Sequence, residues 1–157
     1  MDTHISRRVQ ADPETIFGLA SRVEDWPRIL PHYRWVRVLD DDGHGRRLVE
    51  MAARRDVLGR VGFPLHWTAL ETSRPTEQRI EFEHVRGITR GMCVAWTLVR
   101  APGDTVVEVT IRHVFWPRWG VPDYLVRQVI GEYFVNGVAQ RTLAIIARLA
   151  ESRTKDA

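Results

Sequence analysis

The sequence predicts an α+β domain in which one antiparallel sheet of about seven strands curves round a long C-terminal helix. Between Tyr33 and Phe115, apolar and polar residues alternate with a period of two, and glycine or proline turns separate the alternating runs. From Asp123 to about Arg153 no proline occurs, and apolar residues recur every three to four positions. No helical stretch separates one strand from the next, so neighbouring strands are expected to pair antiparallel.

The length and composition fit one soluble domain over residues 1–157, with 151–157 as a frayed tail. Hydrophobic residues make up 44% of the chain, which is ordinary for a globular protein. No apolar run approaches the ~20 residues that a membrane-spanning helix needs. Met1 is followed by charged residues instead of an apolar signal segment. We therefore expect a cytoplasmic protein without a membrane span.

The cysteine, histidine and arginine content excludes several classes of site. Cys93 is the only cysteine, so an internal disulfide and a thiolate-rich metal site are excluded. The six histidines form no short helical pair, and we expect neither a bound metal nor another cofactor. Nearly all positive charge is arginine, interleaved with acids as between Arg74 and Arg86. This pattern indicates a solvated surface and no nucleic-acid partner.

The N-terminal segment predicts a strand followed by a short helix. The stretch Ile5–Val9 alternates and stops before Asp12 and Pro13, where Asp12 fits a helix N-cap and Pro13 fits the first helical position. The helical spacing that follows is carried by Ile16, Phe17, Leu19, Ala20 and Val23. Trp26-Pro27 then interrupts the amphipathic pattern, so the helix is expected to be short.

The middle of the chain divides into about six strands at its turn sequences. The clearest alternation runs along 107–115, where one face carries Val107, Val109, Ile111, His113 and Phe115. The same one-sided pattern occurs in two earlier strands, with inward-facing Ile80, Phe82 and His84 in one and Met92, Val94, Trp96 and Leu98 in the other. One face of the sheet is therefore expected to be covered and the other to face water.

The C-terminal helix is expected to lie on the apolar face of the sheet. Its predicted stripe consists of Val126, Val129 or Ile130, Tyr133 or Phe134, Gly137 or Val138, Arg141, Ile145 and Leu149. A straight helix cannot touch a strongly bent sheet everywhere, so a chamber is expected between them. The residues expected to line it are Trp35, Arg55, Trp67, Glu71, Phe82, His84, Trp96, His113, Phe115, Tyr133, Phe134 and Gly137. Indole, phenol and imidazole groups facing one space suit an aromatic, oxygenated ligand.

Several segments carry a resemblance to a known family. They are 24–33, with the sequence EDWPRILPHY, His66-Trp67 on one strand, Ala95-Trp96-Thr97 on a later strand, and the uninterrupted terminal helix. Together they resemble the bacterial polyketide cyclase/aromatase family of the START and Bet v 1-like superfamily. The resemblance covers nearly the whole chain and implies the helix-grip fold of that superfamily.

The resemblance also implies roles for particular residues. Trp26 and Tyr33 match a Trp and a Tyr at the family's cavity, with Tyr33 as proton donor, and Trp67 and Trp96 match its strand tryptophans. The chain departs from the family at Glu71, where the family has a cavity arginine that polarises substrate carbonyls. Candidates for a compensating cation are His113, Arg55 and Arg90.

Two functions remain open at this point. The resemblance implies an enzyme that guides aldol ring closure and dehydration of a poly-β-ketone, delivered by an acyl carrier protein. In that case a neutral His113 is the candidate base and Tyr33 the candidate donor. The alternative is a non-catalytic carrier or sensor of a hydrophobic ligand such as a quinone or lipid, which the loss of the arginine at Glu71 favours. Both a monomer and a homodimer fit the sequence.

Overall fold

The computed structural model describes residues 1–157 except 58–60, 118–119, 121, 123 and 125, and it describes no side chains at 55–57, 61–64, 126–127, 129, 133–134 and 136. The strands are β1 Asp2–Val9, β2 Tyr33–Asp41, β3 Arg46–Val57, β4 Val61–Arg74, β5 Arg79–Gly87, β6 Cys93–Arg100 and β7 Val107–Val114. The helical elements are α1 Pro13–Ser21, η1 Val23–Asp25, α2 Trp26–Ile29, η2 Pro75–Glu77, η3 Val126–Ala139 and α4 Gln140–Lys155. This is the predicted order of strand, short helix, six strands and C-terminal helix.

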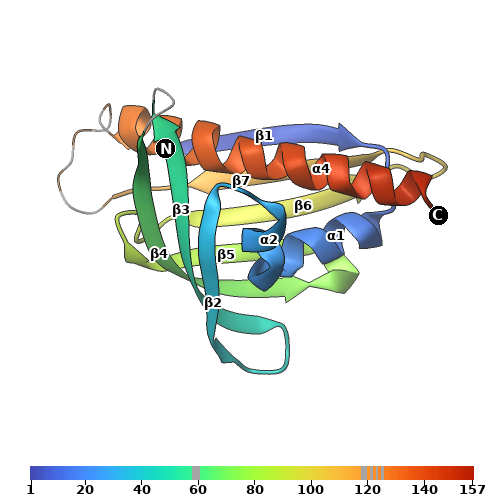
Figure 1. The fold of residues 1–157 in the computed structure, drawn as a ribbon, viewed down its shortest axis with the longest axis horizontal. Coiled ribbons are helices and arrows are strands. Elements are labelled where there is room, and N and C mark those ends of the chain that lie inside the picture. Colours follow the sequence, from blue (N-terminus) through green and yellow to red (C-terminus); the bar gives the residue numbers. More distant parts are fainter. Residues whose placement is uncertain (58–60, 118–119, 121, 123, 125) are drawn as a thin grey trace.

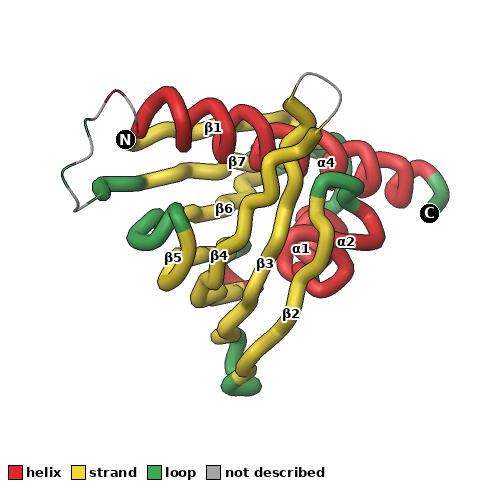
Figure 2. Tube along the Cα trace, turned by 60° about the vertical axis from the view of Figure 1, so that its left-hand side comes forward, coloured by secondary structure: helices red, strands yellow, loops and turns green. Residues whose placement is uncertain are grey.

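All seven strands form one antiparallel sheet in the order β1-β7-β6-β5-β4-β3-β2. Apart from β1, every strand pairs with its neighbour in sequence, because short turns join them. The sheet bends round the helices, so that β2 and β3 run at a steep angle to β6 and β7 (Figure 1). Figure 2 shows α4 crossing the same side of this bent sheet as α1 and α2. The predicted helix-grip architecture is therefore confirmed.

The alternation read from the sequence sets the two faces of the sheet. Along β7 the burial alternates, with Val107, Val109, Ile111 and His113 buried and the residues between them more exposed. Along β5 and β6 the inward-facing Ile80, Phe82, His84, Val94, Trp96 and Leu98 are likewise buried. The inner face and the helices thus form the core, because only this face has a partner layer.

The N-terminal elements differ from expectation in two details. β1 begins at Asp2, earlier than Ile5, because its whole length pairs with β7 from Asp2 opposite Val114 to Val9 opposite Val107. Asp12 occupies the N-cap position of α1, but its side chain makes no capping hydrogen bond. Pro13 at the first helical position therefore does more than Asp12 to define where α1 begins, because its fixed φ suits the first turn.

The C-terminal helix contains a correction to the predicted stripe. Residues Val126–Ala139 form a π-helical segment, η3, and regular α-helix starts at Gln140. A π-helix bonds i to i+5 and so has more residues per turn than an α-helix, and a 3.6-residue period extended from Val126 does not stay in step as far as α4. Arg141 is exposed, and Ile145 and Leu149 are half-buried. The buried face of α4 consists instead of Thr142, Leu143, Ile146, Ala147 and Ala150.

The end of α4 also extends further than predicted. The helix continues to Lys155, a little beyond its predicted end near Arg153, and fraying of 151–157 stays a prediction. Glu151 accepts a hydrogen bond from the backbone N–H of Gln10, at 3.1 Å, and Ala150 is fully buried. These contacts attach the last turns to the N-terminal part of the chain. None of the described helices is both long and apolar enough to cross a membrane.

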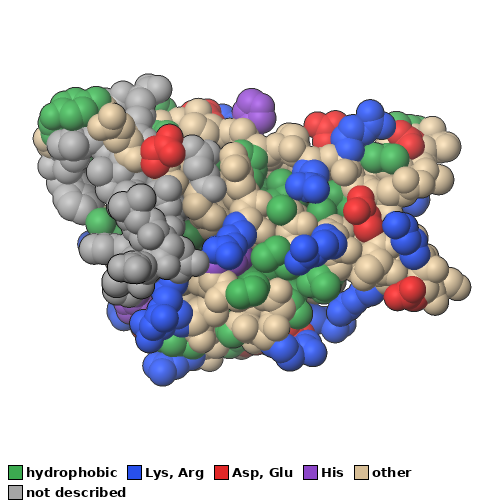
Figure 3. Space-filling model, turned by 45° about the horizontal axis from the view of Figure 1, so that its top comes forward, with side chains coloured by type: hydrophobic (Ala, Val, Ile, Leu, Met, Phe, Trp, Pro, Cys, Tyr) green, Lys and Arg blue, Asp and Glu red, His purple; other side chains and the backbone are tan. Residues whose placement is uncertain are grey.

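The surface in Figure 3 carries its basic side chains singly among neutral and acidic ones. Elsewhere among the described residues, basic side chains form ion pairs, such as Arg112 with Asp2 and Arg79 with Glu81. Exposed pairs of this kind contribute little to stability. Their spacing nevertheless leaves no continuous basic stripe on the described part of this face.

Candidate functional site

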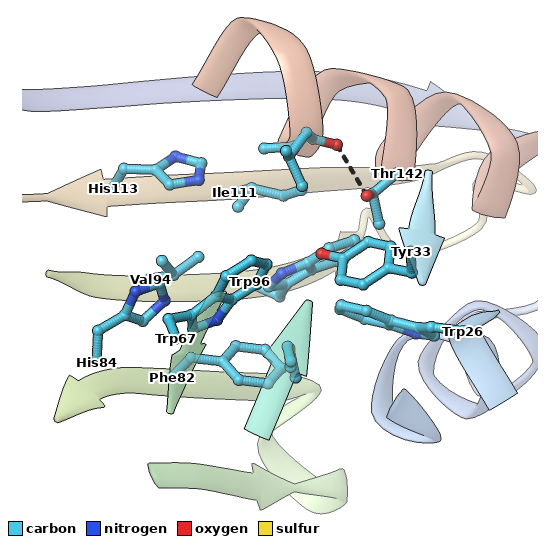
Figure 4. A pocket seen from close by; sticks show the side chains of 13 residues that line it. Trp26, Tyr33, Trp67, Phe82, His84, Val94, Trp96, Ile111, His113 and Thr142 are labelled. Carbon is cyan, nitrogen blue, oxygen red and sulfur yellow. Dashed lines mark hydrogen bonds between the residues drawn. The ribbon is translucent and has the colours of Figure 1, made fainter. Parts of the chain in front are cut away.

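A cavity lies between the inner face of the sheet and the C-terminal helix (Figure 4). Its volume is about 40 Å³. Its lining consists of Trp26, Tyr33, Met51, Trp67, Phe82, His84, Val94, Trp96, Ile111, His113, Val138, Ala139 and Thr142. Strands β2 to β7, α2 and the junction of η3 with α4 all contribute, so the site depends on the complete fold.

Aromatic rings form the walls of the cavity. Trp26 packs edge-on against Tyr33 with ring centroids 5.0 Å apart, and lies 6.3 Å from Trp96 and 6.1 Å from Phe82. Tyr33 in turn meets Trp67 edge-on at 6.1 Å. The indole N–H of Trp26 donates to the carbonyl oxygen of Leu19 in α1 at 3.1 Å. That bond satisfies the buried N–H and leaves the ring face free for packing.

One end of the cavity carries hydroxyl groups. The Thr142 hydroxyl donates to the carbonyl oxygen of Val138 at 2.8 Å, and lies 2.8 Å from Nε2 of the buried His32. The Tyr33 phenol is directed to the same place (Figure 4). Burial raises the pKa of Tyr33 well above its ordinary value, and its interaction with the Thr142 hydroxyl only partly opposes this. The phenol therefore keeps its proton at neutral pH.

The other end carries two imidazoles. His84 and His113 project from β5 and β7, with Val94 of β6 between the two strands (Figure 4). The Nδ1 atom of His84 lies 2.6 Å from the hydroxyl of the buried Thr89, and its ring stacks on Trp67 at 5.8 Å. Nδ1 of His113 is buried and has no hydrogen-bond partner among the described residues.

Both imidazoles are neutral at physiological pH. Burial lowers the pKa of His113 to about 4. Burial, reinforced by the nearby His113, lowers the pKa of His84 to about 3. A neutral imidazole offers one lone pair and one N–H. The described lining thus contains hydrogen-bonding groups at both ends and no charged side chain at pH 7.

Glu71 lies outside this lining, which corrects its predicted place in the chamber. Its side chain is completely buried, and Arg47 opposite it on β3 binds both carboxylate oxygens at 2.9–3.1 Å. Arg47 also binds Glu24 and the carbonyl oxygen of Ser21. Burial raises the pKa of Glu71 to about 7, against the opposing effect of Arg47. The pair joins the sheet to α1 and η1, so it is a structural contact.

Trp35 is also outside the cavity, because a β-bulge reverses its direction. Tyr33 pairs with Ala53 but Trp35 pairs with Ala52, so Arg34 is an extra residue in β2. Trp35 consequently lies on the outer face, 5.4 Å from the exposed His66 ring and beneath the Arg37 guanidinium at 4.5 Å. Two residues that share a face by simple alternation are thereby separated.

The remaining predicted residues divide into three groups. Trp26, Tyr33, Trp67, Phe82, His84, Trp96 and His113 are brought together at the cavity. Phe115 is buried but not in the lining, and Gly137 is half-buried and also outside it. The side chains of Arg55, Tyr133 and Phe134 lie outside the described residues. Ligand binding by any of these residues remains a prediction.

Six of the lining residues were not among those predicted to bind a ligand: Met51, Val94, Ile111, Val138, Ala139 and Thr142. Val94 and Ile111 belong to the alternating patterns, so their place on the inner face of the sheet could have identified them as lining residues. Met51 pairs with Trp67 across β3 and β4 and so shares its face. Thr142 was hidden by the π-helical segment, which shifts the buried face of α4.

The cavity is narrower than the chamber that the sequence predicts. Small-molecule sites usually occupy roughly 300–1,000 Å³, and about 150 Å³ is enough to hold benzene. The observed volume of about 40 Å³ is room for water only. The aromatic side chains themselves fill the gap. A ring-sized ligand therefore has to displace part of the lining, and Met51 is its most adaptable member because its thioether chain is unbranched.

The site shows no sign of metal chemistry. Among the residues that the structure describes, no three His, Cys, Asp or Glu side chains come together as a metal site. Cys93 is exposed, and burial of its surroundings together with Glu83 and Glu81 raises its pKa. A thiol with a raised pKa is a poor nucleophile. The polar groups that the described lining presents are imidazoles and hydroxyls.

Comparison with known proteins gives consistent similarities. The family model described as polyketide cyclase / dehydrase and lipid transport matches residues 9–139. The granaticin polyketide synthase bifunctional cyclase/dehydratase of Streptomyces violaceoruber is 28% identical over 146 residues. The alignment covers 92% of this chain but only 42% of that protein, so the chain spans less than half of its relative's length.

Solved structures share the fold at low sequence identity. TTHA0849 from Thermus thermophilus is similar with a TM-score of 0.77 and 15% identity, over 98% of this chain and 99% of that one. The Zhui aromatase/cyclase from a Streptomyces species is similar with a TM-score of 0.74 and 19% identity, over 98% and 94% of the two chains. These likenesses establish a common fold.

Proposed function

The chain belongs to the polyketide cyclase/dehydrase and lipid transport family, and from this premise we propose that it is a cofactor-free cyclase or dehydratase acting on a poly-β-ketone or aromatic intermediate. The observation that carries the proposal is the placement of a neutral imidazole and a protonated phenol at opposite ends of one aromatic cavity. Aldol ring closure needs a base and a proton donor, and these two groups supply them.

The proposed reaction begins at His113. Its lone pair takes a proton from a carbon between two carbonyl groups while that carbon forms a bond to a second carbonyl carbon. Tyr33 donates its proton toward the oxygen of that carbonyl as negative charge develops. The protonated His113, a strong acid because its pKa is about 4, then gives its proton to the leaving hydroxyl during dehydration. The Tyr33 phenolate takes the remaining proton of the attacking carbon, so both groups return to their starting protonation states. Protons between carbonyls are already acidic, so a weak base is sufficient.

The aromatic walls would select the folded shape of the chain. Rigid rings at 5.0–6.3 Å from one another leave few positions for a flexible substrate. Holding two carbons in contact removes much of the entropic cost of ring closure. Substitutions in the walls should therefore alter the product distribution as well as the rate.

An acyl carrier protein is the proposed donor of the substrate. The end of β5 and the turn that follows it carry the exposed Arg86 and Arg90 on either side of Ile88, which is 49% exposed. Thr89 in this turn bonds to His84 in the cavity wall. A guanidinium group suits the phosphate of a carrier's prosthetic arm. Reversing both charges, in Arg86→Glu with Arg90→Glu, should weaken transfer from the carrier without changing the rate on a free substrate mimic.

The second candidate is a non-catalytic carrier or sensor of a hydrophobic ligand. It is favoured by one observation, the absence of a cation from the described lining, since Arg47 is bound to Glu71 and no guanidinium polarises a ligand carbonyl there. A neutral aromatic cavity can hold a quinone or lipid without any reaction. This alternative requires that the ligand remain unchanged after binding.

The test compares turnover and affinity in the same variants. Tyr33→Phe and His113→Leu are assayed on a poly-β-ketone mimic, with Trp35→Phe on the outer face as the matched control. A cyclase should lose turnover in both cavity variants while binding changes little, and the control should equal the parent. Unimpaired turnover in both variants would show that the acid and base are wrongly assigned. A parent that binds the mimic but never converts it would favour the carrier.

A further inference from the structure

The hydroxyl end of the cavity has a fixed hydrogen-bond direction. Thr142 is 1% exposed and has a single hydroxyl proton, which it donates to the carbonyl oxygen of Val138 at 2.8 Å. Every other partner of its oxygen must therefore donate to it. Nε2 of His32, at 2.8 Å, must accordingly carry the ring proton. The second lone pair of the Thr142 oxygen faces the cavity that this residue lines, where the Tyr33 phenol interacts with it.

His32 cannot easily reverse this direction. The ring is 4% exposed and its Nδ1 has no hydrogen-bond partner among the described residues. Burial, reinforced by the charge of Arg141, lowers the pKa of His32 to about 4, so the ring holds one proton at neutral pH. A proton on Nδ1 would be a buried donor without an acceptor, which is rare in proteins. The proton therefore stays on Nε2. His32 donates to the Thr142 oxygen, and Thr142 donates to the carbonyl oxygen of Val138.

Tyr33 provides the complementary group beside Thr142. Its protonated phenol can donate, whereas the Thr142 oxygen can only accept from the cavity. A ligand hydroxyl placed between them can accept from Tyr33 and donate to Thr142 at the same time. A ketone or a methyl ether has no proton for Thr142, and would leave its lone pair without a donor. This end of the cavity therefore matches a hydroxyl group better than a carbonyl group.

The imidazole end adds no charge to the cavity. Nδ1 of His113 is buried without a described partner, in a side chain that is 1% exposed. The described lining holds no cation. An anionic enolate or phenolate has no counter-charge there, and desolvating it would be costly.

We propose that the cavity selects its ligand as a neutral enol or phenol, with one hydroxyl inserted between Tyr33 and Thr142. This rests on the proposed function, since it concerns the same cavity and refines its substrate class. The bound form would be the enol tautomer of a β-diketone or the hydroxyl of an aromatised ring. Thr142 is then a ligand-contacting residue, and His32 is a positioning residue that acts through it.

The experiment measures binding of two matched probes, 2-naphthol and 2-methoxynaphthalene, by calorimetry at pH 7. The parent should bind 2-naphthol about tenfold more tightly, the effect of roughly one well-made hydrogen bond. Thr142→Val should reduce the ratio to about twofold, because no acceptor remains there. Thr142→Ser should keep the tenfold ratio, and Trp35→Phe on the outer face should match the parent.

The outcomes separate this proposal from the one on which it rests. If neither probe binds the parent, the ligand site itself is wrong and this proposal fails with it. If both bind equally, the ligand site stands and selection of a hydroxyl is overturned. A tenfold ratio that survives Thr142→Val assigns the hydroxyl to another residue and also overturns it. The ratio for the parent is measured without any substitution, so it does not depend on whether a variant folds. A second test is the ¹⁵N spectrum of His32, in which Nε2 should be protonated and Nδ1 unprotonated.

Discussion

Acid should unfold this protein through its buried histidines, and His113→Leu should remove a measurable part of the effect. His32, His84 and His113 are each at most 4% exposed, and their pKa values are lowered to about 4, 3 and 4 from 6.5. A histidine whose pKa is lowered by folding binds a proton more tightly in the unfolded chain than in the folded one, so acid favours unfolding. Stability is therefore complete above pH 6.5 and is lost as the pH falls toward 4.

The magnitude follows from these values. Between pH 7 and pH 5 each neutral, buried histidine costs the folded state about 2 kcal/mol, so the three together cost about 6 kcal/mol. Glu71 opposes them, because its pKa is raised to about 7 from 4.5, and the folded state takes up its proton first. Protonation of Glu71 therefore raises the free energy of unfolding by about 2 kcal/mol between pH 7 and pH 5. The free energy of unfolding should fall by about 4 kcal/mol, a large part of a typical domain's stability.

Urea unfolding at a series of pH values measures this directly. The parent curve of unfolding free energy against pH should be steep between pH 4.5 and 6.5. In His113→Leu the fall from pH 7 to pH 5 should be smaller by about 2 kcal/mol, and in Glu71→Gln it should be larger by a similar amount. Only the pH dependence is compared, since each variant also changes the stability at pH 7. An unchanged pH dependence in His113→Leu would refute a neutral, buried imidazole at this position.

Three further predictions concern the frame of the site. Arg47→Met should cost about 1–3 kcal/mol of unfolding free energy, because the buried Glu71 loses its guanidinium partner and is held as the neutral acid. In Arg47→Met with Glu71→Leu most of that loss should return, and an additive loss in a double-mutant cycle would contradict the coupling. Gly87→Ala should cost about 1–3 kcal/mol, since Gly87 has φ of +100° and an added Cβ would lie 2.5 Å from the carbonyl oxygen of His66; equal thermal midpoints would exclude this strain. Met51→Ala should lower stability by about 2–5 kcal/mol yet tighten binding of 2-naphthol, because it opens the cavity; weaker binding measured by calorimetry would show that Met51 is not the obstacle.

The fold was readable from the sequence because it depends on repeating patterns. The strand Val107–Val114 alternates almost without exception, and the structure buries its apolar face. The aromatic residues that belong to such patterns, Trp67, Phe82 and Trp96, were consequently placed on the correct face. Burial of one face is a property of every second residue, so it can be counted along a strand without knowing which strand pairs with which.

What the sequence did not reveal are local departures from those periods. The bulge at Arg34 turns Trp35 outward although it is two residues from Tyr33. The π-helical segment brings Thr142 to the cavity in place of Arg141. Neither departure leaves a strong signal in one sequence, because both depend on contacts with distant parts of the chain. A shift of one residue is small in the fold but exchanges a guanidinium for a hydroxyl at the site.

The position of Arg47 has a consequence for the proposed chemistry. Its guanidinium lies directly opposite Glu71 in the sheet, on the same inner face as the cavity, and its charge is used there by that carboxylate and by Glu24. Carbonyl polarisation in the cavity then falls to hydroxyl and imidazole groups, which stabilise a full negative charge poorly. A ring closure in this cavity should therefore pass through a neutral enol, with proton transfer accompanying carbon–carbon bond formation. The same neutrality that excludes an enolate would allow an uncharged aromatic product to remain bound, so product release is the step at which a cyclase of this kind should be slowest.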